Sequence, residues 1–402
     1  KQSMGARLAA LAVAAVLTLG MGYSSQAIAE KDDFYQAVNQ ETLKTKTIDP
    51  TEVSWSWFQE RSVKNTKQLE TEVQQMADKA GTYKKGTPEQ KIADLYTCAM
   101  DTKTRNTSSR AQLNEMLKPI QEAKTTAELT QALCDFKEKY GEGLLVDYGA
   151  DRKPSAPVYM SRISVNDTIL TKYDLQKEPE KGLWNTYKTY IADVLKESGV
   201  DANTAKTQAA AILAMEQAWA PAMTDSEKLN DVSVYNQIVL RKDVEAWMPH
   251  MNGKKILASW GLDKEKEVLF FEAPYLKAMD AMYTQEHLPL LKSYLTFIVM
   301  HRYAPYADIK LRNIRRTFTM KRYGIQQPRS DEETASRMVQ DLMSYELGQV
   351  YMKQYGSSVA VADVSQMIRQ IRDIYEQRLQ YNTWLSPQTK AKAIEKLKTL
   401  RA

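Results

Sequence analysis

Cysteine is scarce in this 402-residue sequence, which contains only Cys98 and Cys134. Two thiols cannot form the disulfide framework that stabilises many small secreted domains, and they cannot supply a four-ligand metal site. We interpret both as small hydrophobic residues of the interior, and a Cys98–Cys134 disulfide in an oxidising compartment is the alternative. Because 43% of the residues are apolar, a packed hydrophobic core can stabilise the fold instead.

Histidine is almost as rare, since the sequence has only His250, His287 and His301. A zinc peptidase motif places two histidines one helical turn apart with a carboxylate between them, so that both imidazoles face one Zn²⁺. None of the three lies in an HExxH motif, and no two are four residues apart. We interpret them as solvated or core-edge histidines, and we expect no metal or cofactor site in this chain.

The other common catalytic patterns are also missing. The sequence has no GxSxG, SxxK or CxxC motif, and its 15 glycines are scattered rather than grouped in a phosphate-binding loop. The acidic runs at Asp32–Asp33 and Asp331–Glu333 are interpreted as solvated turns and helix N-termini. The sequence therefore predicts no catalytic residue.

Excess charge is small, with a formal net charge of +5. One basic stretch, interleaved with Phe318 and Tyr323, has two interpretations: a patch that binds a polyanion or nucleic acid, or a helix face paired with carboxylates elsewhere. The mild net charge favours the second, and we expect no nucleic-acid partner. The basic residues are Lys310, Arg312, Arg315, Arg316, Lys321, Arg322 and Arg329.

Residues 1–29 have the pattern of a secretory signal peptide. Arg7 precedes the apolar stretch Leu8–Leu19, and a small-x-small site ends at Ala29, so cleavage is expected before Glu30. The stretch is short for a membrane span, although an uncleaved membrane anchor is the alternative. We expect a secreted or periplasmic protein with no stable membrane span after cleavage.

The rest of the chain shows mainly helical periodicity. A helix is predicted over Glu89–Ala99, after the start signal Gly86-Thr87-Pro88. Helices are also predicted over Ala205–Trp219 and Val364–Leu379, and Ser386 with Pro387 begins a final helix as N-cap and first-turn residue. A β-hairpin is predicted from two β-rich segments, 144–148 and 158–163. We expect a mainly α fold: one large multi-helix body with one small β-hairpin. The final pattern has no helix-stop residue, so we expect a fragment of a longer gene product.

Several local patterns, in order along residues 32–400, resemble the N-terminal region of the neprilysin and endothelin-converting-enzyme family of zinc metallopeptidases. Each pattern is weak alone, and their order and spacing give the resemblance its specificity. The matching segments are Asp33–Asn39, Trp55–Phe58, Lys91–Tyr96, Met215–Gln217, Leu229–Asp231, Tyr235–Asn236, Ala273–Leu276, Glu346–Tyr351 and Trp384–Lys390.

This resemblance implies that residues 30–402 form an N-terminal cap domain. In the family, a zinc domain follows this region and contributes HExxH, a glutamate ligand and a strand that holds the substrate backbone. The cap encloses a cavity that admits oligopeptides. The implied partners are therefore the chain's own C-terminal zinc domain and oligopeptide substrates, with zinc in the catalytic domain. We also expect an exposed apolar surface where the zinc domain packs.

The resemblance also points to candidate residues of the substrate cavity, namely Ser54, Trp55, Phe58 and Gln59. Some family members have an Arg and an Asp near the positions of Ser54 and Gln59, where they hold a substrate carboxylate. Both positions lack charge here, which weakens a carboxylate clamp. A core aromatic cluster of Trp55, Trp57 and Phe58 is the favoured interpretation.

The expected function is thus the non-catalytic N-terminal portion of a secreted zinc metalloendopeptidase. The alternative is a stand-alone extracytoplasmic helical protein that binds peptides or serves a structural role without catalysis.

Overall fold

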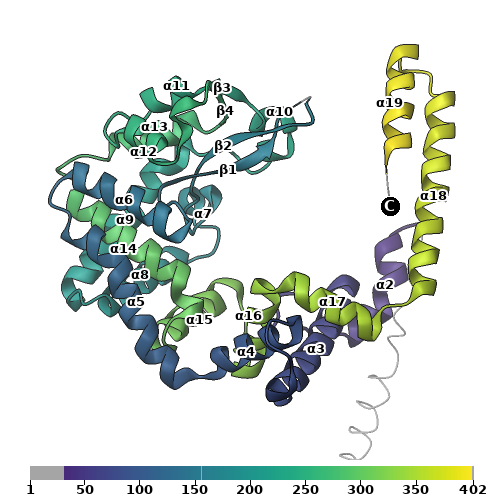
Figure 1. Cartoon of the computed structure of the whole chain (residues 1–402), viewed down its shortest axis with the longest axis horizontal. Helices are drawn as coiled ribbons and strands as arrows, with labels where there is room; N and C mark the ends of the chain where they lie inside the picture. Colours follow the sequence, from purple (N-terminus) through teal and green to yellow (C-terminus); the bar gives the residue numbers. More distant parts are fainter. Residues whose placement is uncertain (1–30, 155, 401–402) are drawn as a thin grey trace, which may run out of the picture. The chain divides into compact units, whose positions relative to one another are not determined.

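The computed structural model describes residues 31–154 and 156–400, and its fold is mainly α-helical. The described residues divide into two compact units, 31–61 and 62–400. The helices of the described residues are α2 (Phe34–Thr45), α3 (Trp57–Asp78), α4 (Pro88–Met100), α5 (Thr102–Glu122), α6 (Thr126–Tyr140), α7 (Lys172–Lys177), α8 (Leu183–Glu197), α9 (Ala202–Trp219), α10 (Val232–Tyr235), α11 (Arg241–Ala246), α12 (Gly253–Ser259), α13 (Ala273–Ala281), α14 (Leu288–Tyr303), α15 (Ile309–Tyr323), α16 (Asp331–Leu342), α17 (Ser344–Tyr355), α18 (Ser358–Tyr381) and α19 (Pro387–Thr399) (Figure 1).

Helix boundaries follow the local signals in the sequence. At the start of α4 the Thr87 side chain accepts a hydrogen bond from the backbone N–H of Gln90, and Pro88 occupies the first turn. Ser386 caps α19 in the same way, through the N–H of Thr389. The predicted mainly α fold and these two helix starts are confirmed. Helix α18 is longer than predicted.

The larger core of the second unit lies between helices α5 to α9, α12 to α15 and the sheet. Helices α8, α14 and α15 meet at an aromatic group in which the Tyr190 and Phe318 rings stack with centroids 4.4 Å apart. Phe297 packs edge-on against Tyr190 at 5.6 Å. Burial of such large rings, together with their preferred edge and stacked geometries, stabilises the junction of these helices.

A smaller core forms where α4 packs against α16 and α17, with α3 completing it (Figure 1). Ile92 of α4 and Val339 of α16 are fully buried there, as is Val73 of α3. Segments more than 200 residues apart in sequence therefore share one core, and α16 connects this small core to α15 of the large one.

The predicted hairpin is present and is extended by two further strands. Strands β1 (Val146–Arg152) and β2 (Tyr159–Val165) pair antiparallel, with Val146 opposite Val165. Strand β4 (Glu267–Leu269) then pairs parallel to β2, and β3 (Ile238–Leu240) pairs antiparallel to β4, giving the order β1-β2-β4-β3. The sequence did not predict β3 and β4, because three residues are too few to show strand alternation.

The side chain of Arg162 on β2 holds the segment that leads into β3. Its Nη1 donates to the carbonyl of Tyr235 at 2.7 Å, and its Nη2 donates to Oδ1 of Asn236 at 2.6 Å. Its Nε also pairs with the Asp151 carboxylate at 2.7 Å. The Tyr235–Asn236 pattern noted in the sequence therefore serves as an anchor for the sheet.

Candidate functional site

The three histidines lie at three separate places in the fold, each with its own partner. Their Nδ1 atoms lie 2.8 Å from Oδ2 of Asp280 for His250, 2.9 Å from Oγ1 of Thr284 for His287, and 2.7 Å from the Tyr190 hydroxyl for His301. Burial, with the nearby charges of Arg315 and Arg302, lowers the pKa of His301 to about 3. His301 is therefore neutral near neutral pH and acts as a hydrogen-bonding group of the interior.

These side chains do not provide a zinc site. Within residues 31–154 and 156–400, no three or more His, Cys, Asp or Glu side chains are grouped so that they could hold a metal ion. Zinc requires about four such ligands at close range. The donor set of the described residues does not fit the metal that the family resemblance implies, so no step of metal chemistry is assigned to them.

The predicted core aromatic cluster is wrong, because the side chains of Trp57 and Phe58 are 55% and 90% exposed. No residue of the described part of the first unit, 31–61, is buried, and so short a segment offers little for these rings to pack against. Trp55 and Trp57 contact each other edge-on, with centroids 5.3 Å apart. Ser54 is exposed as well.

The polar groups beside this aromatic segment are paired with each other. Lys46 lies over the Trp55 ring at 5.4 Å and forms an ion pair with Glu60 at 2.8 Å. Glu60 also accepts a hydrogen bond from the Trp55 indole, and the bonds from Lys46 and Trp55 lower the Glu60 pKa. Gln59 donates to Glu52 at 2.8 Å. Of the substrate-cavity candidates, Phe58 presents the largest uncovered apolar surface.

The two cysteines differ in their surroundings. Cys134 is 4% exposed in the larger core, whereas Cys98 is exposed on α4, and both are free thiols in the structure. Interpretation as a small interior residue therefore holds for Cys134 and not for Cys98.

The signal peptide and its cleavage site at Ala29 and Glu30 lie outside the described residues. None of the helices of the described residues is both long and apolar enough to cross a bilayer.

The basic stretch lies mainly on α15, and several of its charges are paired with carboxylates from other elements. Lys310 pairs with Glu197 of α8 at 2.7 Å, and Arg322 pairs with Asp174 of α7 at 2.7 Å. These contacts agree with the favoured interpretation of a charged helix face paired with distant carboxylates.

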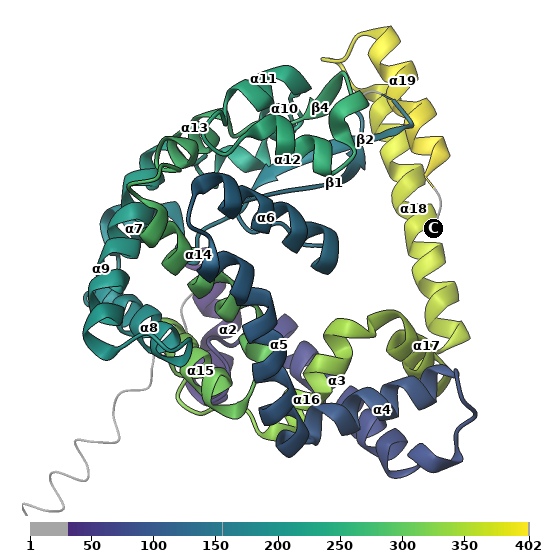
Figure 2. The ribbon, with the colours of Figure 1, turned by 60° about the vertical axis from the view of Figure 1, so that its left-hand side comes forward.

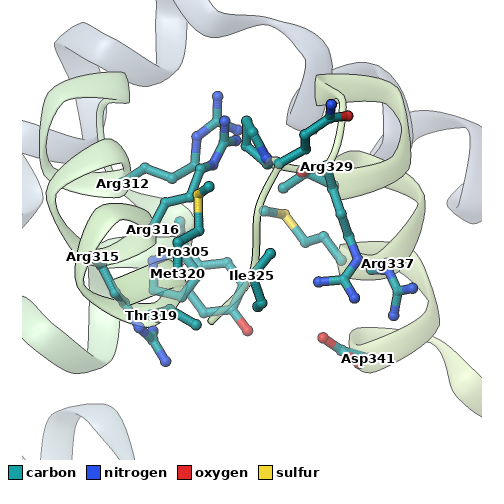
Figure 3. Close-up of a pocket in the computed structure, with 15 residues that line it drawn as sticks. Pro305, Arg312, Arg315, Arg316, Thr319, Met320, Ile325, Arg329, Arg337 and Asp341 are labelled. Atoms are coloured by element: carbon teal, nitrogen blue, oxygen red, sulfur yellow. The ribbon is translucent and has the colours of Figure 1, made fainter. Parts of the chain in front are cut away.

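The remaining arginines of α15 open onto a pocket of about 290 Å³ between α15, the following loop and α16. Figure 3 shows Arg312, Arg315 and Arg316 on one side and Arg329 and Arg337 on the other. The apolar part of the lining comes from Pro305, Tyr306, Met320, Ile325, Pro328 and Met338. Arg337 was not part of the predicted basic stretch, and only the packing of α16 brings it to this pocket.

Helices α18 and α19 lie side by side and bury no residue (Figures 1 and 2). We define the α18 apolar stripe as Val364, Ile368, Ile371 and Tyr375, which recur at helical spacing and therefore share one face. Their side chains are 53%, 40%, 55% and 59% exposed. Apolar residues repeated on one exposed face indicate a surface that another structure covers.

A comparison with protein families assigns the chain. The model of the N-terminal domain of peptidase family M13 matches residues 30–402. The chain belongs to peptidase family M13. The neprilysin-type resemblance seen in the sequence is confirmed, and it extends over the full described region.

Relatives of family M13 agree with this assignment. The chain is 22% identical over 374 residues to a neutral endopeptidase of Lactococcus lactis, covering 91% of this chain and 58% of the relative. It is 25% identical over 248 residues to endothelin-converting enzyme-like 1 of Rattus norvegicus, covering 60% of this chain and 32% of that one. The crystal structure of a zinc metalloprotease of Mycobacterium tuberculosis superposes with a TM-score of 0.81 at 19% identity, covering 94% of this chain and 57% of that one. The chain thus spans about 58% of the length of the neutral endopeptidase that it matches.

Proposed function

We propose that this chain is the non-catalytic N-terminal portion of a secreted zinc metalloendopeptidase that acts on oligopeptides. In this proposal residues 30–402 cap the active-site cavity of a separate zinc domain. The match of the M13 N-terminal model to residues 30–402 is the observation that carries it. The zinc chemistry would belong to the catalytic domain, because the described histidines lie apart and no metal-binding group of side chains accompanies them.

The α18 apolar stripe supports a partner domain. Side chains such as Ile371 and Tyr375 are more than half exposed, and covering apolar surface releases about 25 cal/mol per Å². The occupant we propose is the zinc domain of the same polypeptide. A domain joined to the chain is present at high effective concentration, so a modest apolar surface is sufficient to hold it.

The first test is the reading frame beyond codon 402. We expect it to encode an HExxH motif, because that motif supplies two zinc ligands and the general base of a metallopeptidase. A frame that stops without such a motif would contradict the proposal. It would favour a stand-alone protein. Binding of oligopeptides by this chain without turnover would identify such a protein.

The second test is the activity of the chain itself. We expect purified residues 30–402, supplied with Zn²⁺ and a fluorogenic oligopeptide, to show no chelator-sensitive cleavage. The physical reason is that the described residues lack a ligand set to hold the metal. Turnover that follows the protein through chromatography and stops on chelation would show that the chain is catalytic by itself.

Secretion is part of the same proposal and is tested separately. Expression of the whole sequence with its leader in a bacterial host should give an extracytoplasmic protein whose first residue is Glu30. N-terminal sequencing of the exported protein measures this directly. A membrane-bound product that retains Arg7 would indicate the uncleaved anchor instead.

A further inference from the structure

The lining of the pocket between α15 and α16 contains five arginines and one carboxylate, Asp341 (Figure 3). Glu333 pairs with Arg329 at 2.9 Å and with Arg337 at 3.1 Å, so the excess positive charge lies on the α15 side. Asp331 pairs with Arg312, from Nη2 to Oδ1 at 3.0 Å, and lies 3.7 Å from Nη2 of Arg316. Arg105 of α5 also interacts electrostatically with Asp331. One carboxylate therefore serves three guanidinium groups.

Two of these guanidinium groups are deeply buried, and their hydrogen-bonding capacity is not fully used. Arg105 is 8% and Arg312 is 6% exposed. Nε of Arg312 and Nη2 of Arg316 are both buried without a hydrogen-bond partner, as are Nε and Nη2 of Arg105. Buried charged donors without partners are destabilising, since each loses its hydration without compensation. Because Arg312 and Arg316 both line the pocket, an anion bound there would offset part of this cost through its charge.

Burial also lowers the pKa of Arg312, and the neighbouring charges of Arg105 and Arg316 lower it further, against the opposing effect of Asp331. Burial likewise lowers the pKa of Arg105, whereas the charges of Asp331 and Asp101 raise it. A negative charge bound nearby would favour the charged form of both guanidinium groups and so raise both pKa values.

We propose that this pocket binds a small organic anion, in which a carboxylate or phosphate group is attached to an apolar body. The planar guanidinium forks of Arg312 and Arg316 match the oxygen geometry of both anionic groups. The apolar wall of Met320 and Ile325 (Figure 3), which Met338 completes, suits a short hydrocarbon part. A volume of about 290 Å³ limits the ligand to a small molecule or the end of a chain. The proposal does not depend on the function proposed above.

The test is calorimetric titration of the chain with hexanoate and with hexyl phosphate. The matched controls are hexanol, which lacks the anion, and inorganic phosphate, which lacks the apolar part. We expect at least one hexyl anion to bind with one-to-one stoichiometry, hexanol not to bind, and inorganic phosphate to bind more weakly. Preference for hexanoate or for hexyl phosphate identifies which anionic group the site takes. Equal binding of hexanol, or binding by none of the four, would overturn the proposal.

Two variants with opposite expected effects, together with a control variant, locate the site. Arg316→Gln should weaken binding by about tenfold or more, because hydrogen bonds to charged groups contribute factors of this size. Lys321→Gln removes the same charge from the same helix outside the pocket and should leave affinity unchanged. Asp331→Asn removes the internal competitor and should tighten binding, a result that partial unfolding cannot produce. Equal losses in Arg316→Gln and Lys321→Gln, or weaker binding in Asp331→Asn, would contradict this assignment.

Discussion

Glu216 of α9 is the most deeply buried carboxyl group among the described residues. The fold strongly changes the pH at which this group loses its proton. It is 0% exposed and accepts a hydrogen bond from the Tyr187 hydroxyl at 3.1 Å, while its Oε2 has no partner. Burial raises its pKa to about 8, against the smaller opposing effect of that hydrogen bond. The Met215–Gln217 pattern of the sequence therefore contains an acid that the fold keeps neutral at neutral pH.

A raised carboxyl pKa in the folded state makes stability fall as pH rises. Below about pH 4.5 Glu216 is protonated in both states, and between 4.5 and about 8 only the folded state keeps the proton. The free energy of unfolding should therefore decrease by on the order of 5 kcal/mol across that window. Glu216→Gln, a neutral isostere, should lose this dependence and be more stable than the parent chain at pH 9.

Chemical denaturation at pH 5 and pH 9 measures this effect. The control is Glu227→Gln, which removes an exposed carboxylate and should follow the parent chain at both values. If Glu216→Gln and the parent chain respond equally to pH, Glu216 is not neutral in the fold.

At the scale of elements, helix ends depend on single residues with special backbone geometry. Gly141 ends α6 in the left-handed conformation with φ of 76°, and its N–H donates to the carbonyl of Lys137 at 2.9 Å. Only glycine adopts this conformation without a steric cost. The end of α6 then directs the chain into β1.

Gly141→Ala should destabilise the fold by about 1 kcal/mol, because a Cβ strains the left-handed backbone although open space surrounds it. Gly348→Ala is the matched control. Gly348 lies inside α17, where an added Cβ also meets open space, so alanine should stabilise by up to about 1 kcal/mol. Opposite signs in urea-unfolding measurements would support this account, and destabilisation by both variants would contradict it.

The sequence anticipated elements best where the signal was local. Thr87 with Pro88, and Ser386 with Pro387, mark helix starts because a cap satisfies backbone groups within three residues. The hairpin of β1 and β2 was visible for the same reason. By contrast, β3 and β4 exist because Arg162 and the main chain of β2 hold them, and those partners are more than 70 residues away in sequence.

At the scale of the whole molecule, α18 carries many of the exposed large hydrophobic residues of the described chain. The α18 apolar stripe predicts binding of a hydrophobic dye by the isolated chain. Ile371→Glu should reduce dye fluorescence and change the free energy of unfolding much less than a substitution in a core would, since Ile371 is 55% exposed in the folded chain.

The control for this prediction is Arg369→Glu, a charge change at an exposed position of the same helix. It should leave the dye signal unchanged. Equal dye signals in Ile371→Glu and the parent chain would show that the dye binds elsewhere. A large loss of stability in Ile371→Glu would show that the stripe is part of a core.

The sequence by itself determined the helical class, the M13 resemblance and the absence of an HExxH motif, because periodicity and motif spacing are properties of neighbouring residues. Its expectation for Trp57 and Phe58 failed, because burial depends on what packs against a side chain rather than on its hydrophobicity. Only the tertiary structure decided that Arg105, Arg312 and Arg316 share one carboxylate, since they come from α5 and α15 while Asp331 begins α16. The net charge around a pocket depends on side chains from several elements, which only tertiary packing brings together.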